Sequence, residues 1–506
     1  MRASVGGVSE SSRVSPLPPA DLPTTLGALR AAGHRYRTVK QELRDNLQAR
    51  MRAGAPRFDG IVGYDDTVLP EVERALLAGH DMVLLGERGQ GKTRLIRSLV
   101  ALLDEWTPVI AGSVLNEHPL HPITPTSRAL VAETGDDLPV DWLHRSMRYG
   151  EKLATPDTSV GDLIGDVDPI RLAQGRTLGD PETIHFGLVP RTNRGIFAVN
   201  ELPDLAERIQ VALLNVLEER DIQVRGYQLR LPLDLLLVAS ANPEDYTNRG
   251  RIITPLKDRF GAEIRTHYPT ELELELALIR QEADLVAEVP EHVLEVLARF
   301  ARAVRESPSV DPRSGVSARF AIAAAETVAA AALRRACLLG EDSSVEDDVL
   351  RRAPSSTGDV NKVPFLAAVA RVGDAVSVTS TLRGKVEFES GEEGREIELL
   401  GHLLRTAVAE TFRARLAGLD LSGFTALVEE GQTIETGELV SAAELLRQVG
   451  TVPGLAKVLD RLGAGDAPST GQAAAAVEFV LEGLHLSRRL GKDVTDAGRT
   501  RYGGRT

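Results

Sequence analysis

Residues 82–93 read MVLLGERGQGKT, and this stretch decides the fold. Its second part, Gly86–Thr93, fits the phosphate-binding pattern G-x-x-x-x-G-K-[ST] at every fixed position. The apolar run Met82–Leu85 enters this loop as a strand, and leucines and an isoleucine at helical spacing leave it. Glycines let backbone N–H groups surround a phosphate, Lys92 reaches the outer phosphates, and Thr93 can ligate Mg²⁺. The sequence therefore predicts a site for ATP and Mg²⁺. The residues that we expect to hold the nucleotide are Gly86, Glu87, Arg88, Gly89, Gln90, Gly91, Lys92 and Thr93.

A second apolar strand, Ile196–Val199, ends in Asn200 and Glu201. A nucleoside triphosphatase needs such a strand to hold the metal shell and to orient the attacking water. Glu201 is placed to polarise that water, and Asn200 offers Mg²⁺ a neutral oxygen where an aspartate is usual. Because a carboxylate is the better ligand for a hard cation, we expect Asn200 to slow turnover or weaken metal binding. The departure is silent if Asn200→Asp changes neither the Mg²⁺ dependence nor the ATPase rate.

Short apolar strands alternate with helical patterns between about residues 60 and 270, which predicts an α/β fold with a parallel sheet covered by helices. The expected strands are Met82–Leu85, Pro108–Ala111, Ile196–Val199, Leu235–Ala239 and Glu263–Arg265. From Thr270, which we expect to cap a helix, the pattern becomes helical, and a polar linker at 341–362 precedes further helices and a polar tail. The expected parts are a flexible tail and N-terminal helix (1–59), an α/β nucleotide-binding domain (60–269), an all-α lid (270–345) and a C-terminal helical domain (346–506).

Composition excludes several classes of protein. The 506 residues are 42% hydrophobic and 26% charged, which is typical of globular chains with two to four domains. The net charge of −14 disfavours partners such as nucleic acid and anionic membranes. The single cysteine, Cys337, allows neither an intrachain disulfide nor a four-cysteine zinc site. We see no signal peptide and no charge-free run of 18 residues, so we expect a cytoplasmic protein.

Two smaller features are expected to have no role in binding a ligand or a metal. Glu117, His118 and His121 are of metal-ligand types, but they alternate with prolines, so we expect an extended loop whose side chains face water. Trp106 and Trp142 are expected to pack rather than to bind a ligand.

The motifs together resemble those of the AAA+ ATPases, specifically the branch of MoxR and the magnesium chelatase ATPase subunit (subunit I), over about residues 60–340. In such proteins the segment that matches Ile61, Val62 and Gly63 lies against adenine. The strand Leu235–Ala239 resembles the one that ends in the sensor 1 residue, which implies that Asn242 detects the γ-phosphate.

The resemblance also assigns two arginines. Leu256–Phe260 is similar to the segment whose arginine, here Arg259, acts in the neighbouring subunit's site. Gly315–Arg319 resembles the start of the lid helix with the sensor 2 arginine, which implies Arg319, although a surface ion pair is an equally open interpretation there. An arginine delivered from a second chain makes activity depend on assembly.

Three insertions favour this branch. Extra residues at about 112–152 are expected to form a loop, 158–191 resembles the helix 2 insert, and 222–230 alternates like a hairpin that turns at Arg225 and Gly226 before sensor 1. In this branch such elements face the ring pore or a partner.

The resemblance implies a homo-oligomeric, hexameric ring that hydrolyses ATP to ADP and phosphate and remodels or activates a partner. The partner in this branch is a von Willebrand factor A domain protein, and this chain has no D-x-S-x-S run of its own. A narrower version is metal insertion into a tetrapyrrole. The alternatives are a nucleotide-gated scaffold with little turnover, which Asn200 would allow, and an ATP-dependent transcription regulator, whose G-A-F-T-G-A loop and DNA-binding helix pair we do not find.

Overall fold

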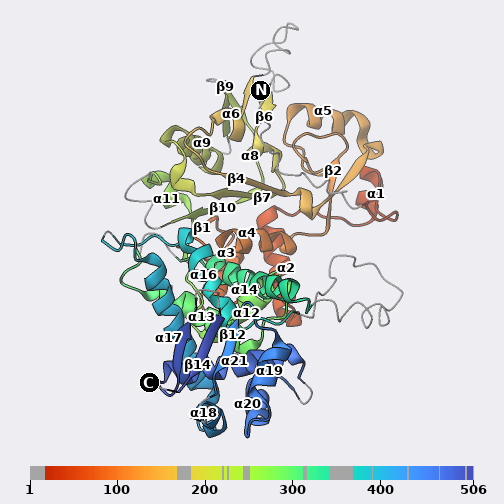
Figure 1. Ribbon diagram of the computed structural model, residues 1–506. Coiled ribbons are helices and arrows are strands. Elements are labelled where there is room, and N and C mark those ends of the chain that lie inside the picture. Colours follow the sequence, from red (N-terminus) through yellow and green to blue (C-terminus); the bar gives the residue numbers. More distant parts are fainter. Residues whose placement is uncertain are drawn as a thin grey trace, which may run out of the picture. The chain divides into compact units, whose positions relative to one another are not determined.

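The computed structural model describes residues 17–167, 184–218, 221–224, 227–242, 251–311, 316–341, 368–389, 391–429, 432–465, 468–495 and 499–504. The chain forms two compact units, which Figure 1 labels by element. The first comprises residues 1–87 and 91–267, and the second comprises residues 88–90 and 268–506.

The first unit is built on a parallel sheet of five strands in the order β11-β1-β10-β7-β4. Every residue of β1, β7 and β10 is buried, as expected for central strands of a sheet that is covered on both faces. The predicted α/β fold is thereby confirmed. The strands are β1 (Met82–Leu85), β4 (Tyr149–Leu153), β7 (Gly195–Asn200), β10 (Leu235–Ala241) and β11 (Ala262–Arg265).

Alternate residues of β1 point into two different cores. Met82 and Leu84 belong to a cluster with helices α2, α3 and α4, whereas Val83 and Leu85 belong to one with α6, α9 and α11. Helix α2 begins at Thr38, whose side chain forms a capping box with Gln41, and ends at Gly54 in the left-handed conformation. The N-terminal helix is thus part of the same core as the sheet.

The remaining elements of the first unit surround this sheet or form separate two-stranded ladders. They are α1 (Leu26–Ala31), α2 (Val39–Ala53), α3 (Val68–Ala78), α4 (Lys92–Ser98), β2 (Trp106–Ile110), α5 (Pro125–Thr134), β3 (Val140–His144), α6 (Val160–Leu163), β5 (Gly165–Val167), β6 (Ile184–Phe186), α8 (Leu188–Arg191), α9 (Glu207–Glu218), β8 (Asp221–Val224), β9 (Tyr227–Arg230) and α11 (Thr254–Arg259), with 3₁₀ turns η1 (Leu99–Leu102), η2 (Gly135–Asp137), η3 (Arg145–Met147) and η5 (Leu202–Asp204).

One predicted strand is misplaced. We expected Pro108–Ala111 in the parallel sheet, but β2 pairs antiparallel with β3 in a ladder of its own. The fifth position in the sheet belongs to β4, which comes from the stretch that we expected to be a loop. An apolar run shows that a strand is buried but not which partner it pairs with. The predicted hairpin at 222–230 is confirmed, because β8 and β9 pair antiparallel, although its turn residues 225 and 226 lie outside the described chain.

The second unit is largely helical around one hydrophobic core that extends from Leu276 to Tyr502. Its helices are α12 (Leu272–Glu282), α13 (Glu291–Glu306), α14 (Ala318–Leu339), α16 (Val376–Thr381), α17 (Glu396–Leu416), α18 (Ser422–Glu429), α19 (Ala442–Val449), α20 (Leu455–Arg461) and α21 (Thr470–Leu486), with 3₁₀ turns η7 (Val372–Ala375) and η8 (Arg383–Lys385). The expected lid and C-terminal helices therefore contribute to a shared core.

Two local expectations in this unit were wrong. Thr270 does not cap α12, because Glu271 holds the N-cap position and makes no side-chain capping bond. The residues after α21, expected as a polar tail, form strands β13 (Gly491–Val494) and β14 (Arg499–Gly503), which join β12 (Ile434–Gly437) in an antiparallel sheet. The aromatic ring of Tyr502 anchors this sheet in the core. Of the expected linker, residues 342–362 lie outside the described chain.

A buried ion pair ties α2 to the segment that leads into β4. The guanidinium of Arg148 donates to both oxygens of Glu42 over 2.6 and 2.7 Å, and its Nε donates to the carbonyl of Arg194 over 2.6 Å. Both side chains are buried, so neither charge can recover its solvation if the other is removed.

We therefore expect Glu42→Ala to destabilise the first unit by about 3–5 kcal/mol, because it leaves a buried guanidinium without its carboxylate. The measurement is denaturant unfolding at neutral pH. Arg30→Ala is the matched control, since Arg30 and its partner Asp136 are 53% and 68% exposed, and it should cost no more than about 1 kcal/mol. Equal losses for the two variants would contradict the prediction.

Candidate functional site

The phosphate loop, residues 86–93, joins the buried strand β1 to helix α4. Gly91 has φ +79° and stands at the N-cap of α4, a left-handed conformation that favours glycine. The loop is fixed to the neighbouring strand, because the N–H of Gly86 donates to the carbonyl of Ala241 over 3.1 Å. Gly91 therefore serves the backbone path of the loop.

Lys92 is buried and all three protons of its ammonium group have acceptors. Nζ donates to the carbonyl of Gly86, to the carbonyl of Glu87 over 2.8 Å and to Oδ1 of Asn242 over 3.0 Å. The structure thus brings the predicted phosphate-binding lysine into contact with the predicted sensor 1 residue, 150 positions away in the sequence.

Asn200 is the last residue of β7 and Glu201 follows it directly. Strand β7 is separated from β1 only by β10. The hydroxyl of Ser240 donates to Oδ1 of Asn200 over 3.1 Å, and the N–H of Glu201 donates to the Ser240 hydroxyl oxygen over 3.3 Å. Glu201 has φ +56° and ψ +49°, an uncommon left-handed backbone for a residue other than glycine. The carboxyl ends of three adjacent parallel strands thus carry the loop, Asn242 and the Asn200–Glu201 pair at one edge of the sheet.

Glu151 is a residue of this edge that the sequence analysis did not single out. Its Oε1 accepts from Nδ2 of Asn200 over 2.7 Å, and its carboxylate binds Nε and Nη2 of Arg97 over 2.8 and 3.0 Å. Burial alone would raise the pKa of Glu151, but hydrogen bonds from Arg97 and Tyr149 outweigh it and lower that pKa. Glu151 is therefore an ionised acceptor at neutral pH. It lies on β4, the strand that had been expected as a loop.

The other predicted site residues are dispersed. Ile61, Val62 and Gly63 are partly exposed, and Ile61 packs against the core that contains α2 and α3. Arg259 ends helix α11, its side chain is 52% exposed, and it forms an ion pair with Glu218 at the end of α9. Arg319 is exposed on the first turn of α14, in the second unit.

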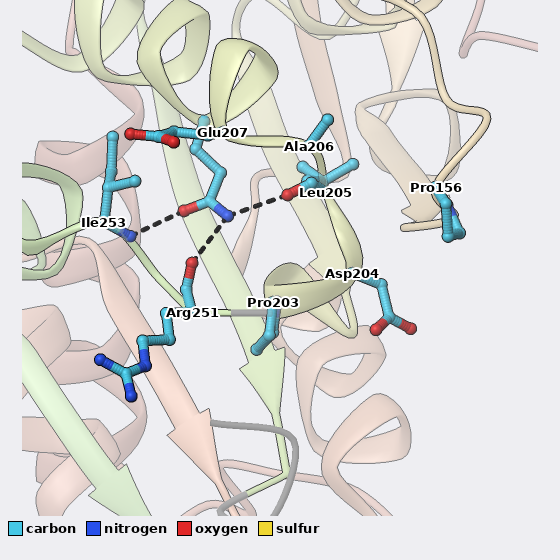
Figure 2. Close-up of a pocket in the computed structure, with 9 residues that line it drawn as sticks. Pro156, Pro203, Asp204, Leu205, Ala206, Glu207, Arg251 and Ile253 are labelled. Atoms are coloured by element: carbon cyan, nitrogen blue, oxygen red, sulfur yellow. Dashed lines mark hydrogen bonds between the residues drawn. The ribbon is translucent and has the colours of Figure 1, made fainter. Parts of the chain in front are cut away.

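A cavity of about 450 Å³ lies beside η5, the turn that follows Glu201 (Figure 2). Gln210 borders it and makes the three hydrogen bonds that Figure 2 shows as dashed lines. Its Nε2 donates to the carbonyls of Leu205 and Arg251 over 2.9 and 3.0 Å, and its Oε1 accepts from the N–H of Ile253 over 2.9 Å. This amide joins the segment after Glu201 to the segment that leads into α11 and Arg259.

The loop that contains Glu117, His118 and His121 is partly buried. Glu117 and His118 are buried rather than exposed as expected, and Glu117 accepts from the N–H of Thr124 over 2.9 Å. His118 accepts from the N–H of Leu120 at Nδ1, so its Nε2 donates to Nε2 of His34 over 3.1 Å. No group of three or more metal-ligand side chains occurs among the residues that the structure describes. Trp142 packs as expected and donates from Nε1 to the carbonyl of Pro23.

Comparisons with known proteins agree with the motifs. No protein-family model matches the chain. Curated relatives include the magnesium-chelatase subunit ChlI of Nostoc sp., 28% identical over 233 residues, which are 45% of this chain and 58% of the relative. The magnesium-chelatase 38 kDa subunit of Cereibacter sphaeroides is 30% identical over 232 residues, 44% of this chain and 62% of the relative. The chain thus spans about three fifths of the length of these relatives.

Solved structures are matched at lower identity. A chain in the complex of subunits BchI and BchD of magnesium chelatase is 23% identical with a TM-score of 0.34, over 60% of this chain and 96% of that one. RuvB of Thermotoga maritima is 13% identical with a TM-score of 0.32, over 60% of this chain and 82% of that one. In the described part of this chain no helix is long and apolar enough to cross a bilayer.

The buried ring of His118 gives the stability of the first unit a pH dependence. Burial, reinforced by the charge of Arg194, lowers the pKa of His118 from 6.5 to about 2. Below pH 6.5 the unfolded chain therefore binds a proton that the folded chain does not. The stability that the neutral His118 ring contributes is fully present above pH 6.5 and is lost on acidification. The free energy of unfolding falls by at most about 1.4 kcal/mol per pH unit from this cause.

We expect His118→Gln to flatten the fall of the unfolding midpoint between pH 6.5 and 4.5, whatever its effect at pH 7.5. His185→Gln is the control, because His185 is exposed in the same unit and its removal should leave the slope unchanged. Parallel pH profiles for the wild type and His118→Gln would contradict this account of the buried ring.

Proposed function

Because this chain is an AAA+ protein of the magnesium chelatase ATPase-subunit type, we propose that it is a ring-forming motor that hydrolyses Mg-ATP to remodel or activate a separate protein. The observation that carries the proposal is the contact of Lys92 with Asn242 beside the strand that ends in Asn200 and Glu201. A lysine in a glycine loop, a polar residue one strand away and an acid two strands away are the parts that phosphoryl transfer requires.

The residues present fit a bound nucleotide and metal. The three oxygens that Lys92 contacts are acceptors of the kind that phosphate oxygens would replace, and the loop around it carries further backbone donors. Residues 86–93 would hold the triphosphate, with Ile61–Gly63 beside the base, and Thr93 and Asn200 would face Mg²⁺. Mg²⁺ neutralises charge on the phosphate oxygens when bound. Glu201 orients the water that attacks, and Asn242 responds to the presence of the γ-phosphate.

Arg259 and Arg319 complete the site in this proposal. Arg259 acts on the nucleotide of the neighbouring copy, which requires a homo-oligomer, and a hexameric ring is the arrangement that the family resemblance implies. Arg319 serves as the sensor 2 residue. The exposed position of Arg259 supports this role, because a neighbouring copy can reach it.

The partner in this proposal is a von Willebrand factor A domain protein on a separate chain, and the work done on it serves metal insertion as the narrower version. The names of the curated relatives support a chelatase-type task. A second candidate, a nucleotide-gated scaffold with little turnover, is favoured by the neutral side chain of Asn200.

Glu201→Gln separates these two candidates. In a motor the variant binds ATP but no longer activates water, so we expect trapped ATP and a loss of steady-state turnover of at least about 100-fold. Phosphate release and retention of labelled ATP on a gel-filtration column measure the two effects. A wild type without Mg²⁺-dependent turnover would support the scaffold and contradict the motor.

Arg259→Ala tests the action between copies. We expect about a 1,000-fold loss of turnover with nucleotide binding retained, because the arginine stabilises charge that develops during transfer. Glu218→Ala is the matched control, since it breaks the same ion pair and leaves the guanidinium in place. If both variants lose turnover equally, Arg259 has a structural role within its own chain. Mixing Arg259→Ala with Glu201→Gln protein should restore part of the activity in mixed rings.

A further inference from the structure

The hydrogen bonds behind Glu201 form a chain with a single direction. The N–H of Glu201 donates to Ser240, the hydroxyl of Ser240 donates to Oδ1 of Asn200, and Nδ2 of Asn200 donates to Oε1 of Glu151. Every donor points toward the Glu151 carboxylate, and Arg97 donates to both oxygens of that carboxylate. The chain thus crosses from β10 through β7 to β4 and reaches α4 at its end.

The identity of each donor follows from Glu151. An ionised carboxylate can only accept, so the NH₂ group of Asn200 must face Glu151 and its carbonyl must face Ser240. The hydroxyl proton of Ser240 is then committed to Asn200, which leaves its oxygen free to accept from the N–H of Glu201. Asn200 and Ser240 are both buried, where such bonds are strong and polarise one another.

An aspartate could not replace Asn200 in this chain of hydrogen bonds. Aspartate has no donor for Glu151, so two carboxylate oxygens would lie at the 2.7 Å that now separates Nδ2 of Asn200 from Oε1 of Glu151. The side chain that departs from the usual pattern is therefore the one that its neighbour across the sheet requires.

The chain of hydrogen bonds also stabilises the unusual backbone conformation of Glu201. The left-handed backbone of Glu201 is unfavourable for a residue other than glycine and persists only where the surroundings fix it. The bond from its N–H to Ser240 is one such constraint, and it is oriented through Asn200 by Glu151.

We propose that Glu151, Asn200 and Ser240 are positioning residues that hold Glu201 in place to orient the attacking water, and that the amide of Asn200, which would face Mg²⁺ in the proposed function, serves as a donor–acceptor link rather than as a defective form of the usual carboxylate. The proposal rests on the role of Glu201 in the proposed function. It predicts that the pair at positions 151 and 200 works as one carboxylate and one amide, in either order.

The test compares Asn200→Asp, Glu151→Gln and the double variant, which exchanges the carboxylate and the amide. We expect Asn200→Asp to lower kcat about ten-fold or more, with the KM for ATP and the affinity for a fluorescent ATP analogue with Mg²⁺ changed less than about three-fold. The double variant should recover kcat to within about three-fold of the wild type, because the amide introduced on β4 can then donate to the carboxylate introduced on β7. Ser240→Ala should lower kcat without a charge clash.

Asn193→Asp controls for damage from any buried aspartate. Asn193 also donates and accepts, to the carbonyl of Leu115 over 2.7 Å and from the N–H of Asp234 over 2.8 Å, but it does not contact Glu151 in any described hydrogen bond. Adding Glu151→Gln should therefore not rescue Asn193→Asp in kcat or in unfolding midpoint.

Two results would overturn the proposal. One is an Asn200→Asp enzyme as active as the wild type or more so, with tighter Mg²⁺ binding, which is the weakened-ligand interpretation. The other is additivity of the two single substitutions in the double variant. If the wild type hydrolyses no ATP, the proposed function fails first, and the additivity of the unfolding midpoints then decides whether the carboxylate–amide link exists.

Discussion

The candidate site depends on the hydrogen-bond acceptors that surround one buried cation, the ammonium group of Lys92. Lys92 lies in the interior of the first unit, and an ammonium group there is tolerated only if acceptors replace its water. Those acceptors come from the loop after β1 and from Asn242 after β10, two strands that are neighbours in the sheet although they are far apart in the sequence. Because parallel neighbours end at the same edge, the fold supplies the cation with partners that local structure alone cannot.

The sequence predicted those strands in which every residue is buried and apolar residues therefore follow one another without a break. β1, β7 and β10 are buried on both faces, so they appear as continuous apolar runs that can be recognised without a partner. β4 reads YGEKL and lies at the edge of the sheet, where half-exposed positions accept charge, so its pattern resembled a loop. The strands β13 and β14 were not predicted for the same reason, since their sequences GKDV and RTRYG bury little besides Tyr502.

The candidate site divides along the same line. Lys92, Asn200, Glu201 and Asn242 are parts of local motifs and could be found by pattern. Glu151 could not, because its relation to Asn200 exists only through the pairing of β4 with β7, which sets Leu153 opposite Asn200. The sequence alone therefore leaves a departure from a motif ambiguous. Within β7, the amide of Asn200 is only a missing carboxylate. Beside β4, the same amide is the donor that Glu151 requires.

The environment of each arginine, rather than its residue type, decides what it can do. Arg148 is buried with Glu42, and separation of this pair would leave two uncompensated charges in the interior, so its partner is fixed for as long as the unit is folded. Arg259 is paired with Glu218 at the surface, where an ion pair contributes at most about 1 kcal/mol. A triphosphate offers more negative charge than one carboxylate. The exchange of Glu218 for the nucleotide of a neighbouring copy would therefore cost little and gain a stronger electrostatic interaction, which is what a residue shared between copies requires.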